Sequence, residues 1–265
     1  GDRTYDATTN TYTYTSKTAA NNSVALGNAA KAKAESTTAL GNKASAEALG
    51  AVALGGNTAA GAKALGVDSI AIGGQSVAGG STAARAIAMG LGAQSLGSSS
   101  VSIGESTLAK YSNSVVLGSN SQAKSDFMVS IGAGAGKTKN DASQTTNGDN
   151  PANESFGIYI GTEAGLNSSG NQNTVIGSYA AGANLAGAGN TVLGAQAGRS
   201  YNGNQNVILG RGAGSSKDGS TSVGNNNVMI GLGARVDKGN DGVAIGTAAL
   251  AEANEGIAIG KGAQA

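Results

Sequence analysis

The sequence of 265 residues contains no cysteine and no histidine. Disulfides and thiolate chemistry are therefore excluded, and so are the general base and the transition-metal ligand that proteins use most often. These absences argue against an enzyme and against a metal centre. We expect the chain to need no cofactor.

Aromatic residues are also scarce, because the chain has no Trp and only two Phe. Large aromatic side chains usually supply much of the buried area of a thick hydrophobic core. The apolar content here is mostly Ala, Val, Ile and Leu, accompanied by 45 glycines. Such a composition can fill a thin interior but not a thick one.

Charge and long apolar runs are lacking as well. Only 12% of the residues are charged, and the formal net charge is +1. A nucleic-acid-binding protein needs a basic stripe to meet phosphates, so we expect no nucleic-acid partner. No run of 18 apolar residues exists, so we expect no membrane contact by this fragment.

What the sequence has instead is an internal repeat. A segment with a β-branched residue first, an aliphatic residue third and glycine fourth recurs along the chain, and six of the fourteen intervals between these glycines are 14 residues long. The residue before the glycine is always Leu, Ile or Met. The repeated segments are Val24–Gly27, Thr38–Gly41, Val52–Gly55, Ile70–Gly73, Ile87–Gly90, Val101–Gly104, Val115–Gly118, Val129–Gly132, Ile158–Gly161, Thr174–Gly177, Thr191–Gly194, Val207–Gly210, Val228–Gly231, Val243–Gly246 and Ile257–Gly260.

A second pattern lies between the glycines. Small residues alternate there, as in Ala30, Ala32 and Ala34, with polar residues such as Lys31 and Lys33 or Gln122 and Lys124 between them. This is the period of a strand with one buried face and one face in water. Each repeat thus predicts two strands of about five residues joined by turns. Units this short must stack on neighbours, which predicts an all-β chain folded as a parallel β-solenoid. The residues taken to carry its structural repeat are Leu26, Gly27, Leu40, Gly41, Leu54, Gly55, Ile72, Gly73, Ile103, Gly104, Leu117 and Gly118.

The triplets before the glycines predict more than one chain. Several are apolar at all three places, such as Val52-Ala53-Leu54. Adjacent strand residues point to opposite faces, so one face can fill the coil and the other needs a cover. We expect a homo-oligomer with these triplets at its centre, and this argument leaves dimer and trimer open. If Ala53 lies on the covered face, Ala53→Asp should weaken assembly.

The repeats also resemble a known family. Asn22-Ser23-Val24-Ala25-Leu26-Gly27 and the alternating Ala residues after it are similar to the head repeats of YadA-type trimeric autotransporter adhesins, over residues 21–132 and 239–265. The resemblance implies a left-handed parallel β-roll in a homotrimeric head. It also implies a place at the cell surface of a Gram-negative bacterium, held in the outer membrane through a stalk and anchor outside this chain.

The resemblance implies partners and ligand positions too. Members of the family bind extracellular matrix proteins such as collagen, host or bacterial cells, or abiotic surfaces. Segments of this repeat are implicated in collagen binding, and the matching candidate positions here are Asn22, Ser23, Val24, Asn113, Ser114 and Val115. The alternative is that these residues serve only the fold.

The chain divides into four predicted parts. Residues 1–20 lack the repeat, and we expect them to form an N-terminal cap with a strand at Thr11–Thr15. Regular repeats fill 21–132, a polar insertion loop fills 133–157, and repeats with longer turns fill 158–265. In the last part an Asn stands four residues before several glycines, and stacked Asn side chains predict a hydrogen-bonded ladder: Asn173, Asn190, Asn206 and Asn227. Ala-Gly pairs such as Ala197-Gly198 indicate enlarged turns.

Three other functions fit the sequence less well. Hexapeptide acyltransferases are also left-handed β-helices, but their catalytic His is absent here and the period is not a multiple of six. An ice- or lattice-binding solenoid needs a regular rank of Thr, which the sequence lacks. The segment Gly132–Thr138 resembles a phosphate-binding loop, but Ile131 stands where that motif needs its first glycine.

Overall fold

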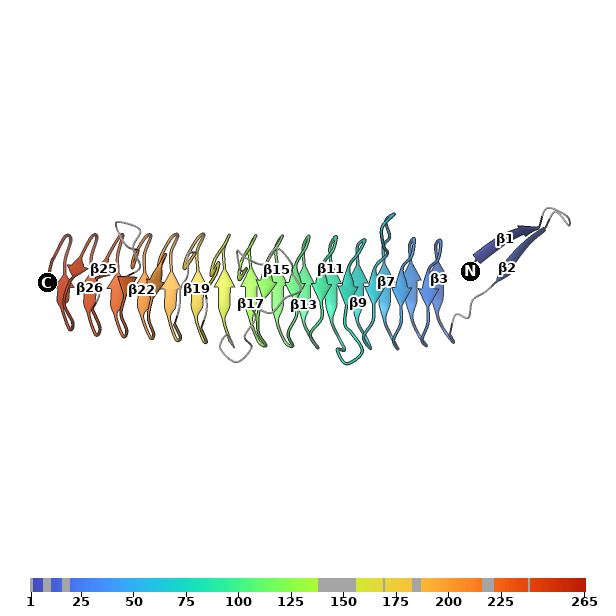
Figure 1. Cartoon of the computed structure of the whole chain (residues 1–265), viewed down its shortest axis with the longest axis horizontal. Coiled ribbons are helices and arrows are strands. Elements are labelled where there is room, and N and C mark those ends of the chain that lie inside the picture. The colour runs from blue at the N-terminus through green and yellow to red at the C-terminus, as the bar shows by residue number, and fades with distance from the viewer. Residues whose placement is uncertain are drawn as a thin grey trace. The chain divides into compact units, whose positions relative to one another are not determined.

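The structure is a computed structural model that describes residues 2–6, 11–15, 20–137, 156–168, 170–182, 187–215, 222–237 and 239–265. Within these residues every regular element is a β-strand, and nearly all strands pair in parallel (Figure 1). The predicted all-β class and parallel β-solenoid are thus confirmed. The chain forms two compact units, Gly1–Ser114 and Val115–Ala265, each of which is described by itself.

The first unit begins with a hairpin. Strands β1 (Asp2–Asp6) and β2 (Thr11–Thr15) pair antiparallel, with Asp2 opposite Thr15. The strand predicted at Thr11–Thr15 is therefore confirmed. The capping role of residues 1–20 stays a prediction, as do the other three predicted domain ranges.

The coils of the first unit contain two columns of strands. The triplets form one parallel column, in which Val24 pairs with Thr38 and Thr38 with Val52: β3 (Val24–Leu26), β5 (Thr38–Leu40), β7 (Val52–Leu54), β9 (Ile70–Ile72), β11 (Ile87–Met89) and β13 (Val101–Ile103). The small-residue strands form the second: β4 (Lys31–Ala32), β6 (Ser45–Ala46), β8 (Lys63–Ala64), β10 (Val77–Ala78), β12 (Gln94–Ser95) and β14 (Leu108–Ala109).

The second unit keeps the triplet column but only pieces of the other. Its triplets are β15 (Val115–Leu117), β17 (Val129–Ile131), β18 (Ile158–Ile160), β19 (Thr174–Ile176), β20 (Thr191–Leu193), β22 (Val207–Leu209), β24 (Val228–Ile230), β26 (Val243–Ile245) and β28 (Ile257–Ile259). The shorter strands are β16 (Gln122–Ala123), the pair β21 (Tyr201–Asn202) and β23 (Ser222–Val223), and the pair β25 (Arg235–Val236) and β27 (Leu250–Ala251). Because β17 pairs directly with β18, the coils resume at once after the polar insertion. Most of that insertion, residues 138–155, lies outside the described residues.

The strands are shorter than the sequence predicted. They span three and two residues per coil instead of about five, so that expectation was wrong. The reason is the two sharp corners of each coil, which consume the remaining residues. A residue in the left-handed region stands five places before the repeat glycine, as at Asn22 (φ 58°), and another two places after it, as at Lys43 (φ 58°). Such corners end a strand abruptly.

The repeat glycine has its own physical cause. Gly27 has φ 132°, and a Cβ added there would lie 2.5 Å from the carbonyl oxygen of Gly41 in the next coil. Gly231 stands in the same relation to Gly246, with φ 132° and a distance of 2.5 Å. Stacking of the coils therefore requires glycine at this place, both for the backbone angle and for the close approach.

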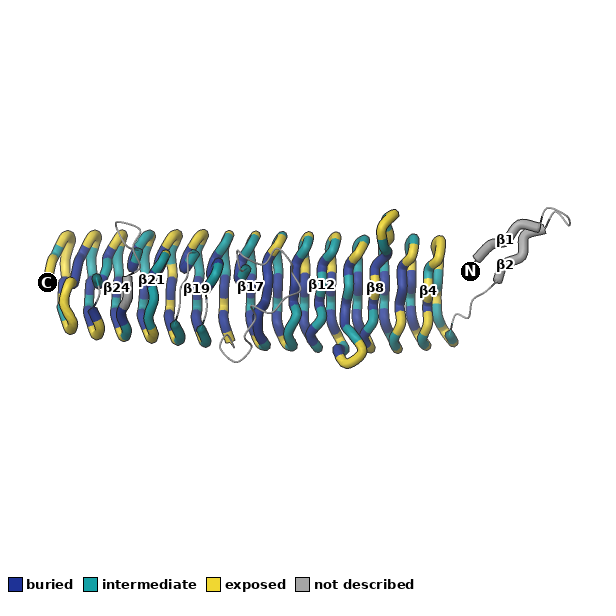
Figure 2. Tube along the Cα trace, in the orientation of Figure 1, coloured by how far each residue is buried: buried dark blue, intermediate teal, exposed yellow. Residues whose placement is uncertain are grey.

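The triplets bury their middle residue and turn the two outer residues outward. Ala39, Ala53 and Val175 are fully buried inside their own coils, whereas the first and third residues of most triplets are half-buried or exposed. Figure 2 displays this alternation of buried and more exposed segments along the coils of each unit. Ala53 therefore lies in the interior of its own chain, and the expectation that it could face a partner was wrong. Sequence alternation could not decide which of the two faces points inward.

The outer face of the second strand behaves as predicted only in part. Lys31 and Lys33 are exposed, but Gln122 and Lys124 are buried, at 4% and 3% exposure. In the second unit the turn around Ser168 covers this place, and the Lys124 Nζ atom donates a hydrogen bond of 3.3 Å to the Ser168 carbonyl oxygen. The longer turns of the second unit thus cover a face that was predicted to meet water.

Candidate functional site

The outward face of the triplet strands is the most conspicuous candidate surface in each unit. It carries aliphatic side chains that a single chain leaves in solvent: Val24 and Leu26 are 56% and 64% exposed, and Leu40 is 44% exposed. In the second unit Leu193 is 48% exposed, and Ile257 and Ile259 exceed 60%. Contiguous apolar surface of this kind marks an interface, because leaving it wet forfeits about 1.5–3 kcal/mol per large side chain.

The aliphatic residue and the glycine at the end of each repeat have different roles at this face. The third residue of each triplet points outward, while the glycine after it makes the corner and the close contact with the next coil. The outward residues among those predicted to carry the repeat are Leu26, Leu40, Leu54, Ile72, Ile103 and Leu117. The fold therefore does not need them for its own interior, and their aliphatic nature calls for another explanation.

The first set of candidate ligand positions lies at the start of β3. Asn22 makes the left-handed corner and is exposed, and Val24 belongs to the outward face. The Ser23 hydroxyl donates a hydrogen bond of 2.8 Å to the Ala34 carbonyl oxygen. Asn22 and Val24 are therefore accessible in a single chain, whereas the Ser23 hydroxyl is already engaged within the fold.

The second set repeats this arrangement. Asn113 makes a left-handed corner (φ 56°) and is exposed, and Val115 is half-buried on the outward face. Ser114 is fully buried, and its hydroxyl donates a hydrogen bond of 2.7 Å to the Tyr111 carbonyl oxygen. The two sets are thus equivalent positions of different coils rather than parts of one pocket, and their role in ligand binding stays a prediction.

The Asn ladder predicted for the second unit is present. Asn190 donates from Nδ2 to the Asn173 Oδ1 atom at 3.0 Å, and Asn206 donates in the same way to Asn190 at 2.9 Å. The backbone N–H of Asn227 donates to the Asn206 Oδ1 atom at 2.9 Å. All four side chains are buried. Each of these side chains therefore joins one coil to the next, and buried polar groups are satisfied largely across coils.

Tyr201 closes this ladder. Its ring is fully buried, and its hydroxyl accepts a hydrogen bond of 2.8 Å from Asn227 Nδ2 and donates one of 3.3 Å to the Gly224 carbonyl oxygen. Burial raises the pKa of Tyr201 to about 12, although the hydrogen bond from Asn227 opposes the shift. This hydroxyl therefore stays protonated at neutral pH and bridges two hydrogen bonds within the fold.

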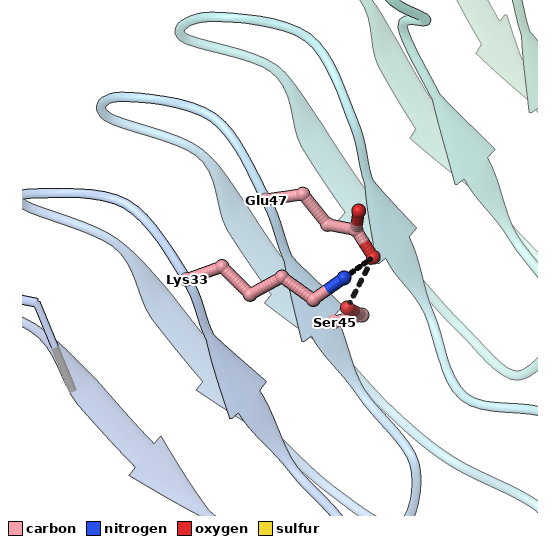
Figure 3. Close-up of polar contacts among 3 residues, drawn as sticks. All are labelled: Lys33, Ser45 and Glu47. Atoms are coloured by element: carbon pink, nitrogen blue, oxygen red, sulfur yellow. Dashed lines mark hydrogen bonds and ion pairs between the residues drawn. The ribbon is translucent and has the colours of Figure 1, made fainter. Parts of the chain in front are cut away.

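A small charged cluster lies on the first unit (Figure 3). Lys33 Nζ is 2.8 Å from Glu47 Oε1, and the Ser45 hydroxyl donates a hydrogen bond of 2.7 Å to the same oxygen. The bond from Lys33 is the main cause that lowers the pKa of Glu47. Because both charged side chains are well exposed, the cluster joins two neighbouring coils at the surface and offers no enclosed catalytic geometry.

Two aromatic residues were missed as candidate functional residues. Phe127 and Phe156 are exposed, and their rings stack with centroids 5.3 Å apart. Both stand at the left-handed corner before a triplet, with φ 58° and 66°, where most coils carry a small or polar residue. A bulky residue rarely adopts this backbone angle. The signal was available, since these are the only two phenylalanines in the sequence.

The described part of the chain contains neither a metal-ligating cluster of carboxylates nor a membrane-spanning helix. No group of three or more carboxylates there is placed to hold a metal ion. The same residues contain no helix that could span a bilayer.

Family comparison bears on the function of these coils. A family model described as the YadA head domain repeat (2 copies) matches residues 19–44, 32–58, 64–83 and 238–263. These segments are similar to YadA head repeats. Together with the β-solenoid, they fit a YadA-like head of a trimeric autotransporter adhesin. No curated protein matches the chain.

The YadA head repeats imply an adhesin-type function within trimeric autotransporters. The family is non-enzymatic, and its members are exposed at the outer membrane. The matches cover the start of the first unit and the last coils of the second, whereas residues 84–237 lie outside them. That interval contains the Asn ladder and the insertion, where the sequence pattern departs most from a 14-residue coil.

Proposed function

We propose that this chain is the head of a homotrimeric cell-surface adhesin, with the outward faces of its triplet strands packed against one another around a three-fold axis. The observation that carries the proposal is the exposure of aliphatic side chains on that face, such as Leu26 at 64% and Leu193 at 48%. Identical faces on identical chains can cover each other in a closed cyclic assembly. The YadA head repeats favour three chains over two.

The opposite side of the coils suits a surface that meets water and ligands. In the first unit it presents Lys31, Lys33 and Glu47, which are exposed. Attachment would target extracellular matrix proteins such as collagen, host or bacterial cells, or abiotic surfaces, from the outer membrane of a Gram-negative bacterium. Of the predicted ligand positions, Asn22 and Asn113 are exposed corners outside the triplet strands, and we propose these two as ligand-facing. Val24 and Val115 lie on the face that the trimer would cover, and the Ser23 and Ser114 hydroxyls are engaged within the fold. Three chains multiply weak contacts into firm attachment.

No observation favours the competing functions. The acyltransferase alternative needs a catalytic His, which the sequence lacks. The ice- or lattice-binding alternative needs a regular rank of Thr, and the outward triplet positions hold Val, Ile, Leu and Thr without such a rank. We therefore propose a binding protein rather than an enzyme.

A display experiment tests the adhesive function. The chain is fused to a heterologous stalk and anchor on a non-adherent Gram-negative bacterium, and attachment to collagen-coated and uncoated plastic is counted under flow. We expect attachment above that of cells displaying the stalk alone. Equal attachment by the two strains, with the head confirmed on the surface by antibody, would count against the adhesin assignment.

A further inference from the structure

A pocket of about 450 Å³, open to solvent on one side, lies in the second unit, at the corners that follow three successive triplets. Ser119 and Asn120 form one wall, and Thr162 and Glu163 form the opposite wall. Hydrogen bonds fix these corners, since Gly134 N donates to the Ser119 carbonyl at 2.9 Å and Glu163 N donates to the Ala133 carbonyl at 2.8 Å. The walls are thus held by the same stacking that builds the solenoid.

The cavity exists because the middle corner is small. Ala133 and Gly134 follow the repeat glycine there, and no other coil has two residues this small at these places. Asn120 and Glu163 occupy the equivalent corner in the coils on either side, both with left-handed backbones (φ 57° and 51°). A Cβ added to Gly134 would lie 3.3 Å from Glu163 Cγ. The absent side chain at Gly134 therefore leaves the gap between two polar walls.

The lining chemistry selects a class of ligand. Lys137 and Glu163 both line the pocket, and the ion pairs found among the described residues include none between them. A small anion would meet the Glu163 carboxylate, and a small cation would meet the Lys137 ammonium. A neutral ligand rich in hydroxyls suits both, because a carboxylate accepts, an ammonium donates, and the Thr162 hydroxyl does either. Asn120 Nδ2 donates a hydrogen bond of 2.9 Å to Ser119 Oγ, which leaves the Asn120 carbonyl oxygen as an acceptor and the Ser119 hydroxyl as a donor.

An apolar floor completes the site. Leu166 and Ala133 line the pocket, and Leu166, which is 5% exposed, offers a small apolar surface there. A pyranose ring has one edge of hydroxyls and a C–H face that packs on such a floor. The volume lies within the usual range for small-molecule sites that combine apolar walls with a few convergent polar groups.

We infer that this cavity, the Gly134 notch, binds a neutral mono- or disaccharide. As the ligand site of an adhesin it rests on the proposed function, but every lining residue belongs to one chain, so saccharide binding does not require the trimer. Carbohydrate on a host or bacterial surface is then a target of this head, separate from the proposed ligand positions Asn22 and Asn113.

Ligand-observed NMR titrations with free glucose, galactose, mannose and N-acetylglucosamine, together with a glycan microarray, test the inference on the whole chain. At least one neutral sugar should bind, with a Kd of about 1 mM for a free monosaccharide. Gly134→Asn should weaken this binding at least roughly tenfold by filling the notch. Asn is tolerated at this corner, as Asn120 demonstrates with φ 57°. Glu163→Gln, which keeps the size but removes the charged acceptor, should weaken binding by roughly fivefold.

The matched control is Gly233→Asn. Gly233 occupies the same corner of another coil with φ 63°, and an added Cβ would meet nothing within 4 Å. Its sugar affinity should equal that of the unchanged protein. Absence of binding to any neutral saccharide, or equal weakening by Gly134→Asn and Gly233→Asn, would overturn the inference. A protein that binds no sugar yet sediments as a trimer and adheres would overturn only the Gly134 notch, whereas a monomer that binds sugar would overturn only the proposed function.

Discussion

The two units build their coil interiors differently. In the first unit the middle residue of the triplet is small, as at Ala39, Ala53 and Ala71, and the second strand forms two backbone hydrogen bonds per coil, as Lys31 N to Ala44 O and Lys33 N to Ala46 O. In the second unit the middle residue is large through most of the coils, and this place holds Tyr159, Val175, Val192, Ile208 and Met229. At the Ala-Gly turns between Gly136 and Gly214 the short second strand is interrupted, and single backbone bonds join the described coils there, as Gly198 N to Ala213 O.

The Ala-Gly pairs of the second unit explain why a large middle residue and an interrupted second strand occur together. A Cβ at Gly214 would lie 3.1 Å from two atoms of Ile208, and a Cβ at Gly165 would collide with the Tyr159 ring. Glycine thus makes room for the large middle residue, and its left-handed backbone turns the chain where the first unit has a strand. The Asn ladder joins the same coils, so side-chain amides replace backbone bonds that the wider interior removes.

The largest expected effect concerns the wide interior itself. Ile208→Ala should lower the free energy of unfolding by about 2–5 kcal/mol, because a fully buried side chain is truncated. The counterpart in the narrow interior is Ala71→Ile, which should cost about 1–3 kcal/mol through overpacking. Denaturant titration measures both. If Ala71→Ile stabilised the protein, the coil interior of the first unit would not be narrower than that of the second.

Breaking the Asn ladder should lower the free energy of unfolding somewhat less than truncating Ile208 does. Asn190→Leu preserves size but leaves the backbone N–H of Asn206 and the Gly203 carbonyl without their partner, and should cost about 3 kcal/mol. The matched change in the first unit is Ser100→Ala at the equivalent place, where the hydroxyl donates to the Gly97 carbonyl of its own coil. That change should cost about 1 kcal/mol. Amide hydrogen exchange should rise in the coils around Asn190 in the Asn190→Leu variant, and should not rise around Ser100 in the Ser100→Ala variant. Similar losses of unfolding free energy in the two variants would contradict the distinction between cross-coil and within-coil hydrogen bonds.

Alkaline pH should weaken the second unit selectively. The pKa of Tyr201 is raised to about 12, so the unfolded chain loses this proton near pH 10 while the folded chain keeps it. Stability is therefore complete below pH 10 and falls between pH 10 and 12, by about 2–3 kcal/mol. Thermal melts across this range measure the loss, and Tyr201→Phe should abolish the slope. If Tyr201→Phe left the dependence of stability on pH unchanged, titratable groups other than Tyr201 would cause it.

Acid should produce the smallest effect, and in the first unit. The pKa of Glu47 is lowered from its ordinary value of 4.5 by its bond from Lys33, so this stabilisation is present above pH 4.5 and fades as pH falls through the lowered pKa. Since Glu47 and Lys33 are 35% and 48% exposed, Glu47→Gln should cost under about 0.5 kcal/mol at neutral pH. Glu35→Gln on the preceding coil serves as the control. A cost above 1 kcal/mol for Glu47→Gln would show that solvent screens the pair less than its exposure indicates.

The sequence predicted the periodic parts of this fold and missed what periodicity does not encode. Every repeat glycine follows a strand, as at Leu26 and Gly27, because spacing and residue type report stacking directly. The ladder from Asn173 to Asn227 followed from the same logic. The inward face of Ala53 was assigned wrongly, since alternation distinguishes two faces but not inside from outside. The sequence does not predict the Gly134 notch, because the notch arises from a side chain that is absent between two neighbours, in a stretch that instead resembles a phosphate-binding loop.

The central claim is that the outward triplet faces cover one another, and sedimentation equilibrium tests it most directly. The unchanged chain should sediment at three times 25.3 kDa. Leu40→Lys in the first unit or Leu193→Lys in the second should shift the mass toward a single chain, whereas Val77→Lys on the second strand of a coil should leave the trimer intact. A folded chain that sediments at 25.3 kDa over the whole concentration range would contradict the account.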